Sequence, residues 1–171
     1  MDDLAGRKVF IKALGLKKGR ILDVGLGACG CMSFLLASKG FSVIGTDHSK
    51  QAIHEARENA KKKKFKGSFQ SRLADAEKLP FKNNEFDAVI AYRSLHHIQN
   101  INKAIKEMFR VCRGNGVVLI SDPNEQELKG KYEHVPDPDR HFKTIESSLA
   151  KHTKSIIRKK TKHNKMYICK K

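Results

Sequence analysis

The stretch RILDVGLGACG, residues 20–30, constrains the fold of this chain more than any other. Its apolar half, Ile21 to Val24, predicts a buried strand of a parallel sheet, because such strands are apolar on both faces. The glycines that follow allow a sharp turn and a close approach of the backbone to a ligand. The run SFLLAS at 33–38 then predicts a helix whose first N–H groups face that loop. A strand, a glycine loop and a helix in this order predict a small-molecule binding site.

The chain has 171 residues, which is the size of one domain with a core of its own. No run approaches 18 consecutive apolar residues, and the first residues lack the basic-then-apolar order of a signal peptide. We therefore expect a cytoplasmic protein without a membrane segment. The four cysteines, Cys29, Cys31, Cys112 and Cys169, form no C-x-x-C pair. We expect small buried thiols rather than a disulfide framework or zinc ligands, and no metal site.

The net charge of +17 would favour a polyanion such as RNA as a partner. However, the excess is mostly lysine and is spread over helix faces as well as clusters. No RNA-binding module or aromatic stacking pattern is visible. RNA therefore stays an alternative, and a small-molecule substrate is favoured.

A second strand is predicted from Phe41 to Thr46, and it ends at Asp47. A carboxylate at that position can accept two hydrogen bonds from a ribose diol. The alternative is that Asp47 only caps the following helix together with Ser49. The distance of Asp47 from the glycine loop favours ribose binding.

Two cofactor classes fit the glycine loop. Read from Gly25, GLGACG fits the dinucleotide pattern G-x-G-x-x-G and leaves a nicotinamide-dependent oxidoreductase open. Read from Asp23, DVGLGAC resembles the D-x-G-x-G-x-G of class I S-adenosylmethionine (SAM) methyltransferases, with Cys29 in the place of the third glycine and Gly30 expected to take over the turn. A carboxylate at Asp23 would repel a pyrophosphate, so it favours a cationic sulfonium ligand.

The resemblance extends over roughly residues 18–122. The segment ADAEKLPF at 74–81 resembles the D-A-x-x-L-P-F of the group that includes the quinone-biosynthesis C-methyltransferases, and FDAV at 86–89 and EMFRVCRGNGVVLISD at 107–122 resemble later family segments. In those relatives the acid and the next residue hold the adenine edge. The resemblance therefore implies that Asp75 binds the exocyclic amine and that Ala76 makes a backbone contact.

The alternation of strands and helices predicts an α/β fold with a mostly parallel sheet and helices on both faces. The resemblance implies a doubly wound, Rossmann-like sheet of seven strands in the order 3-2-1-4-5-7-6. We expect one domain with an N-terminal helix in 1–17, a SAM-binding core at 18–122, a polar segment at 123–142 as a substrate gate, and a helix and hairpin at 143–171. The helix Ile101 to Cys112 should be stopped by the glycines at 114 and 116.

The segment YRSLHHI at 92–98 follows the fourth predicted strand and should lie beside the transferred group. A histidine here could act as a general base, and His96 is favoured over His97. The alternative is that one of the two packs against the next helix. Arg93 could instead orient an anionic substrate.

These observations lead to one hypothesis, a SAM-dependent methyltransferase with an unidentified acceptor. A nicotinamide-dependent oxidoreductase and a non-catalytic SAM-fold module that binds RNA or a protein are the alternatives. The small size suggests that a homodimer or a partner protein completes the acceptor pocket. The predicted catalytic residues are His96 and Arg93. The predicted cofactor-binding residues are Asp23, Gly25, Gly27, Cys29, Asp47, His48, Asp75, Ala76 and Arg93.

Overall fold

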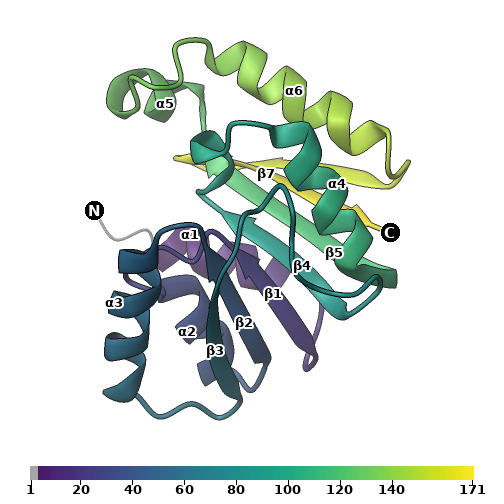
Figure 1. Cartoon of the computed structure of the whole chain (residues 1–171). Helices are drawn as coiled ribbons and strands as arrows, with labels where there is room; N and C mark the ends of the chain where they lie inside the picture. Colours follow the sequence, from purple (N-terminus) through teal and green to yellow (C-terminus); the bar gives the residue numbers. More distant parts are fainter. Residues whose placement is uncertain (1–3) are drawn as a thin grey trace.

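A seven-stranded sheet forms the centre of the molecule in this computed structural model, which describes residues 4–171 (Figure 1). The strand order is β3-β2-β1-β4-β5-β7-β6, and β7 is the one strand that runs against its neighbours. The strands are β1 Arg20–Val24, β2 Ser42–Asp47, β3 Ser68–Leu73, β4 Phe86–Tyr92, β5 Cys112–Pro123, β6 Ile156–Lys160 and β7 Asn164–Lys170. The predicted fold class and strand order are confirmed.

Helices cover both faces of this sheet (Figure 1). On one face lie α1 (Leu4–Ala13), α2 (Cys31–Ser38) and α3 (Lys50–Lys61), and on the other lie α4 (Ile101–Val111), α5 (Glu125–Lys131) and α6 (Pro138–Ala150). The helix α4 shows why the sequence folds this way, because its apolar side chains recur at helical spacing and are buried on the sheet. Each face therefore has an apolar core of its own.

The parallel strands place their carboxyl ends at one edge. Val24 of β1 pairs with Thr46 of β2, and Asp23 lies level with Ile90 of β4. The chain order reverses at β1, since β2 lies on one side of it and β4 on the other. Ligands of open α/β sheets bind outside the carboxyl ends of the strands at such a switch point. The fold therefore places the glycine loop after β1 at the expected binding edge.

The segment 123–142 differs from the expected loop. It contains α5 and the first turn of α6, so the polar stretch is partly helical. Pro138 stands at the start of α6, and the side chain of Asp137 accepts a hydrogen bond from the Arg140 N–H at 2.9 Å. Proline is favoured in the first helical turn, where its missing N–H has no partner to lose. The helix expected within 143–171 therefore begins earlier, at Pro138.

The end of α4 also differs from the prediction. The helix ends at Val111, and β5 begins at Cys112, before the two glycines. Asn115, between these glycines, has a φ of 63°. The chain therefore turns within the first residues of β5, before the part of the strand that pairs continuously with β4. The glycines shape the entry to the strand rather than the end of the helix.

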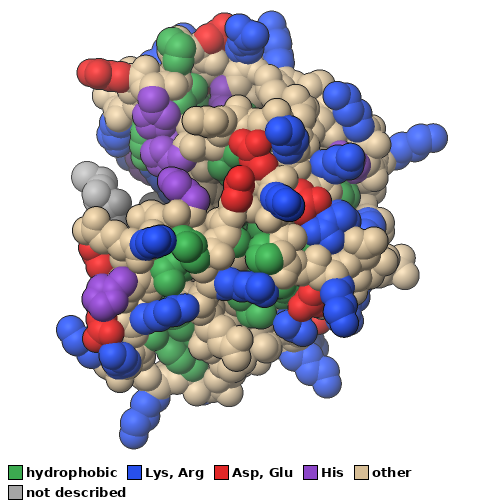
Figure 2. Space-filling model, in the orientation of Figure 1, with side chains coloured by type: hydrophobic (Ala, Val, Ile, Leu, Met, Phe, Trp, Pro, Cys, Tyr) green, Lys and Arg blue, Asp and Glu red, His purple; other side chains and the backbone are tan. Residues whose placement is uncertain are grey.

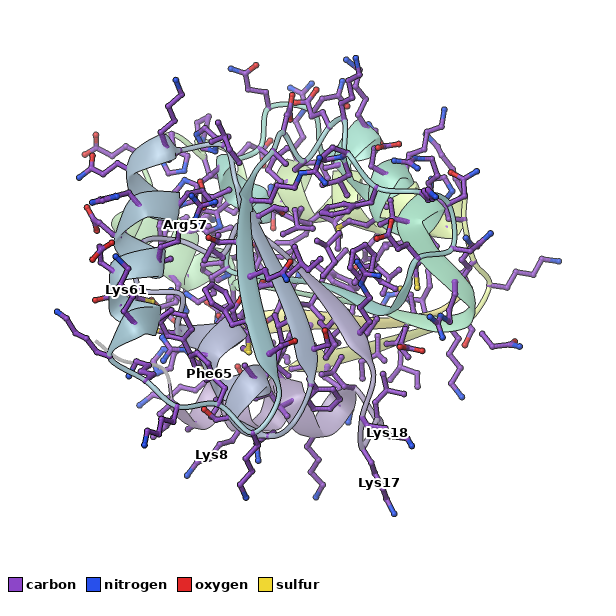
Figure 3. All side chains as sticks on the ribbon, turned by 60° about the horizontal axis from the view of Figure 1, so that its bottom comes forward. Lys8, Lys17, Lys18, Arg57, Lys61 and Phe65 are labelled. Carbon is purple, nitrogen blue, oxygen red and sulfur yellow. A yellow bond between two sulfur atoms is a disulfide. The ribbon has the colours of Figure 1, made fainter. Side chains whose placement is uncertain are left out.

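Cationic side chains are distributed widely over the surface. Lys and Arg side chains stand over both the upper and the lower part of the face in Figure 2. Lys8, Lys17 and Lys18 point away from the molecule into solvent, whereas Arg57 lies on α3 and donates hydrogen bonds to Ser71 of β3 (Figure 3). Within residues 4–171, no helix has the length and apolar character needed to cross a membrane.

Candidate active site

A cavity of about 500 Å³ lies at the carboxyl ends of β1, β2 and β4 and is closed on one side by the loop after β3. This volume lies in the range of small-molecule and cofactor pockets, roughly 300–1,000 Å³. Seven of the predicted site residues line it, namely Gly25, Gly27, Asp47, His48, Asp75, Ala76 and Arg93. The structure thus brings together side chains from four separate segments of the chain.

The glycine loop needs its glycines for two different reasons. Gly25, Gly27 and Gly30 all have positive φ, at 80°, 64° and 58°. A Cβ at Gly25 would also lie 2.5 Å from the Cβ of Ser94, whereas a Cβ at Gly27 would meet nothing within 4 Å. Gly25 is therefore fixed by close packing, and Gly27 leaves an open backbone surface toward the cavity. Gly30 takes the turn before α2, as expected from the cysteine at 29.

Asp47 ties the glycine loop to the end of β2. Its Oδ2 accepts a hydrogen bond from the Gly27 N–H at 3.1 Å, and its Oδ1 accepts one from the Ser49 N–H at 2.9 Å. Ser49, not Asp47, is the N-cap of α3, because the Ser49 side chain accepts from the Ala52 N–H. The carboxylate is only partly buried and lines the cavity, so its remaining lone pairs are available to a ligand.

Asp75 and its neighbours form the opposite wall. Asp75 is exposed, and its Oδ1 accepts a hydrogen bond from the Glu77 N–H at 2.8 Å, which closes a tight turn. Glu77 in turn accepts a hydrogen bond from the Asn100 N–H at 2.9 Å. The loop after β3 is therefore fastened to the segment that enters α4.

Asp23 lies under the glycine loop and does not line the cavity. The side chain is 1% exposed and accepts a hydrogen bond from the Ser33 hydroxyl at 2.6 Å. Burial raises the pKa of Asp23 to about 6, the Ser33 hydrogen bond opposes this, and the negative charge of Asp47 adds to it. A cation bound above the loop would be attracted by the ionised form of this carboxyl group.

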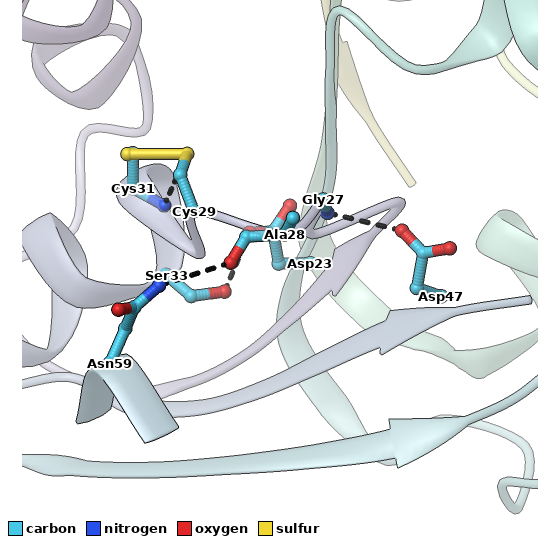
Figure 4. Close-up of a disulfide and its surroundings, with 8 residues drawn as sticks. All are labelled: Asp23, Gly27, Ala28, Cys29, Cys31, Ser33, Asp47 and Asn59. Carbon is cyan, nitrogen blue, oxygen red and sulfur yellow. Dashed lines mark hydrogen bonds between the residues drawn. A yellow bond between two sulfur atoms is a disulfide. The ribbon is translucent and has the colours of Figure 1, made fainter. Parts of the chain in front are cut away.

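Cys29 departs from the expected role. It forms a disulfide with Cys31 at the exposed side of the loop, away from the residues that line the cavity (Figure 4). The expectation of buried thiols is therefore wrong for Cys29 and Cys31. It is confirmed for Cys112 and Cys169, which are free and buried. Burial raises the pKa of Cys112 to about 11, so this thiol stays protonated near neutral pH.

Arg93 lines the cavity and also holds the far wall in place. Its φ is 56°, an unusual value outside glycine, and its N–H donates to the Ser121 carbonyl at 2.6 Å. The guanidinium donates to Asn164 Oδ1 at 2.8 Å and to the Tyr132 hydroxyl at 3.3 Å. Arg93 therefore joins β4, β7 and the end of α5.

His96 does not line the cavity but takes part in a buried network behind it. Its Nδ1 lies 3.0 Å from Asp122 Oδ1, and His141 Nε2 lies 3.0 Å from Asp122 Oδ2. The Asp122 side chain is fully buried. Burial works to raise the pKa of Asp122, but the hydrogen bonds from His141 and His96 outweigh it and lower the pKa below the usual value. Asp122 is therefore a carboxylate held between two imidazoles.

His97 is the histidine that faces the cavity. Its pKa is lowered to about 4, chiefly by loss of hydration and then by the neighbouring His96 and His134, while Asp122 opposes the shift. The imidazole is therefore neutral near pH 7. Of the two adjacent histidines, the structure directs His97 and not the favoured His96 toward a bound ligand, because Leu95–His97 form a short 3-10 turn that was not expected.

Several lining residues were not predicted. They are Val24, Thr46, Ala74, Glu77, Ser94, Ile98 and Gln99. Most lie within two positions of a predicted residue, so they could have been inferred from the ends of the predicted strands. Ser94 has a defined role, since its hydroxyl donates to the Val24 carbonyl at 2.8 Å and locks β4 to β1. Tyr132 and His134, which belong to the polar segment 123–142 expected as a substrate gate, lie close to His96 and His97.

A family model described as a methyltransferase domain matches residues 16–170. The chain is 30% identical over 122 residues to a ubiquinone/menaquinone biosynthesis C-methyltransferase of Geobacter sp. strain M21, which covers 69% of this chain and 52% of that protein. It is 34% identical over 110 residues to a ubiquinone biosynthesis O-methyltransferase of Pelagibacter ubique, and the match covers 64% of this chain and 44% of that protein. The chain thus spans about half the length of these curated relatives.

The fold has solved counterparts. One is a geranyl diphosphate C-methyltransferase of Streptomyces coelicolor, crystallised with Mg²⁺, geranyl diphosphate and S-adenosyl-L-homocysteine (SAH). It has a TM-score of 0.78 and 12% identity, and the match covers 98% of this chain and 79% of that one. The seven-stranded sheet and its covering helices are therefore shared with a solved structure across almost the whole chain.

Proposed function

Because the chain belongs to the methyltransferase-domain family, we propose that it transfers the methyl group of SAM to a small-molecule acceptor. The observation that carries the proposal is the cavity in which the glycine loop and the Asp47 carboxylate stand side by side, joined by the Gly27 N–H. The relatives described above are a C-methyltransferase and an O-methyltransferase of quinone biosynthesis and a C-methyltransferase of geranyl diphosphate. The acceptor of this chain is unidentified.

The residues of the cavity suit the three parts of SAM. Asp47 would accept hydrogen bonds from the ribose hydroxyls, and the open backbone at Gly27 leaves room for the cofactor to lie against the loop. Asp75 and Ala76 would contact the adenine edge from the opposite wall. The buried Asp23 carboxyl group favours a positive charge above the loop without touching it.

SAM supplies an activated methyl group, so the protein has mainly to position the acceptor and exclude water. Arg93, Ser94 and His97 line the end of the cavity nearest the α5–α6 side and would contact the acceptor there. His97 is neutral near pH 7, and its pKa of about 4 makes it a weak base, so its proposed role is contact with the acceptor rather than proton removal. His96 is not placed to make this contact, and its proposed role becomes the support of this wall through Asp122.

The strand order of the sheet argues against the interpretation of the loop as a dinucleotide-binding site. The strand β7 is inserted antiparallel between β5 and β6, whereas the dinucleotide fold in its common form has the order 3-2-1-4-5-6. The family match is to methyltransferases as well. A nicotinamide cofactor therefore serves as the negative control in the test below.

The test is calorimetric titration of the full chain with SAH, in parallel with NADH. The wild type is expected to bind SAH and not NADH. Asp47→Ala is expected to weaken SAH binding by about 10- to 150-fold, because a hydrogen bond to a charged group contributes roughly 1.5–3 kcal/mol. Glu58→Ala removes a carboxylate from α3 outside the cavity and should leave the affinity unchanged. If the folded wild type does not bind SAH, the proposal is wrong.

Partners beyond the acceptor remain proposals. The RNA alternative rests on the net charge of +17, and on the face drawn in Figure 2 the Lys and Arg side chains are spread out rather than gathered in one place. Measuring the binding of a single-stranded RNA at rising salt would separate a specific site from charge alone, since binding by phosphate contacts falls steeply with salt. Sedimentation would test whether a homodimer completes the acceptor pocket.

The cytoplasmic location also stays a proposal. The Cys29–Cys31 disulfide bears on it, because disulfides rarely persist in a reducing compartment. Trapping free thiols in cells with an alkylating reagent, followed by mass analysis, would show whether the two cysteines are oxidised. Two alkylated cysteines at 29 and 31 are expected in the cytoplasm.

A further inference from the structure

Three histidines converge at the wall of the cavity that faces α5 and α6. His96 and His97 follow β4, and His134 stands in the turn between α5 and α6. One ring nitrogen of each lies within 4.8 Å of the others. Figure 2 shows histidine side chains gathered on the upper side of the hollow that crosses this face. We propose that His96, His97 and His134 bind a divalent transition-metal ion, with Zn²⁺ as the reference case.

His96 is held in the orientation that a metal ligand needs. A carboxylate can only accept, so the hydrogen bond with Asp122 Oδ1 places the proton of the imidazole on Nδ1. This leaves the lone pair on Nε2. Metal-ligating histidines commonly donate their other N–H to a carboxylate in this way, which fixes the ring and raises its basicity. Asp122 is held in turn by His141 on its other oxygen.

The lone pair of His96 Nε2 has no partner within the described residues. The atom is fully buried, and the His96 side chain is 1% exposed. A buried polar atom of this kind calls for an explanation, such as an ion or a water that it contacts. A metal ion between the three rings would satisfy it. This unpartnered nitrogen points to a ligand independently of the grouping of the three rings.

The other two ligands can complete the site by small movements. His97 and His134 are exposed, and their rings stack with centroids 4.8 Å apart. Tetrahedral zinc with Zn–N bonds near 2.0–2.1 Å needs nitrogen atoms about 3.3 Å apart. The ring nitrogens now lie within 4.8 Å of one another, so metal binding requires the exposed side chains of His97 and His134 to rotate toward His96.

The donor set indicates the class of ion. Imidazole nitrogens suit zinc, copper, nickel and iron, whereas Mg²⁺ and Ca²⁺ prefer oxygen ligands. Three protein ligands leave one coordination position open, as in catalytic zinc sites. His97 lines the cavity, so the ion would lie in the cavity wall. If the proposed function holds, an acceptor thiol or hydroxyl that ligates the ion would release its proton to water before it receives the methyl group. Metal binding itself does not depend on that function.

The test uses the tag-free full chain, first treated with a chelator and then titrated with Co²⁺ and with Zn²⁺. Tetrahedral Co²⁺ is followed by its visible absorption, and Zn²⁺ by competition with a coloured chelator. We expect one ion per chain, without the thiolate-to-cobalt absorption that cysteine ligands would give. His134→Ala should weaken binding at least 100-fold, whereas His54→Ala, an exposed histidine on α3, should leave it unchanged.

A second variant tests the support behind the site. Asp122→Asn keeps the shape of the side chain but removes its charge, and should weaken metal binding by about 10- to 100-fold. If the wild type binds neither ion, or if His134→Ala binds as tightly as the wild type, the three rings are a packing cluster and the proposal is wrong. Equal loss in His54→Ala would also overturn it, because the signal would then come from scattered surface histidines.

Discussion

Two walls of the cavity, the glycine-loop wall and the histidine wall, are built in different ways. The glycine-loop wall comes from residues 23–47, and its contacts run between neighbouring segments, such as Gly27 to Asp47. The histidine wall joins β4, β5, α5, α6 and β7 through Asp122 and Arg93, with partners up to 71 residues apart in the chain. The first wall depends on backbone conformation, and the second depends on a buried polar network.

This difference has an energetic meaning. A side chain added to the glycine loop is destabilising, because an L-residue is strained at positive φ and a Cβ at Gly25 would also clash with Ser94. Removal of a buried carboxylate is destabilising, because its hydrogen-bond donors are left without an acceptor. Substitutions that act on one wall should therefore spare the other.

The largest effect is expected on the histidine wall. Asp122→Ala leaves His96 and His141 buried without their shared acceptor, so we expect a loss of about 3–5 kcal/mol in the free energy of unfolding. Urea denaturation followed by circular dichroism measures it. Asp139→Ala, on the exposed side of α6, should cost less than about 1 kcal/mol. Equal losses in the two variants would mean that the buried network adds nothing to stability.

On the glycine wall, Gly25→Ala and Gly27→Ala form a matched pair. Both carry the strain of an L-residue at positive φ, about 1–2 kcal/mol. Only Gly25→Ala also forces a Cβ against Ser94, which adds roughly 1–3 kcal/mol of overpacking. Thermal or urea unfolding should therefore show that the Gly25→Ala variant is less stable than the Gly27→Ala variant. The reverse order would show that the Ser94 contact is not the constraint.

The smallest effect depends on pH and comes from Asp23. Its pKa is raised from 3.8 to about 6 by burial, so the folded state holds this proton more tightly than the unfolded state. The resulting stabilisation is complete below pH 3.8 and is lost as the pH rises through 6. The change amounts to about 2–3 kcal/mol at 1.36 kcal/mol per pKa unit.

Asp23→Asn isolates this effect, because an amide cannot titrate and can still accept from Ser33. As the pH rises from 4 to 7.5, the free energy of unfolding of the wild type should fall relative to that of the variant. Urea titrations at several pH values measure it. A difference that stays constant with pH would contradict the burial of an ionisable carboxyl group under the loop.

The sequence was most informative where the signal is local. The strand Arg20–Val24, the glycines after it and Asp47 follow each other within 28 residues, and the strands predicted at Ile21 to Val24 and at Phe41 to Thr46 lie where β1 and β2 are observed. Glycine spacing reports backbone geometry directly, so the cavity wall at Gly25 and Gly27 could be predicted. Asp75, in the loop after β3, was expected only from the resemblance of ADAEKLPF to a family segment.

The segment 123–142, which holds Tyr132 and His134, was expected at the site as a substrate gate, but the contacts of the histidine wall could not be predicted, because its members are distant in the chain. His134 lies 37 residues after His97, in a polar stretch whose prolines suggested a loop. Pro138 instead opens α6, and the Asp137 cap before it was the signal that a helix begins there. The Cys29–Cys31 pair was missed because a spacing of one residue is not a familiar disulfide pattern.

One experiment tests the central claim that a single cavity has a cofactor wall and a separate histidine wall. SAH affinity is measured by calorimetry for the wild type, Asp47→Ala and His134→Ala. Our account predicts tight SAH binding in the wild type and in His134→Ala, and binding weakened at least tenfold in Asp47→Ala. Absence of SAH binding in the folded wild type, or equal affinity in all three proteins, would contradict it.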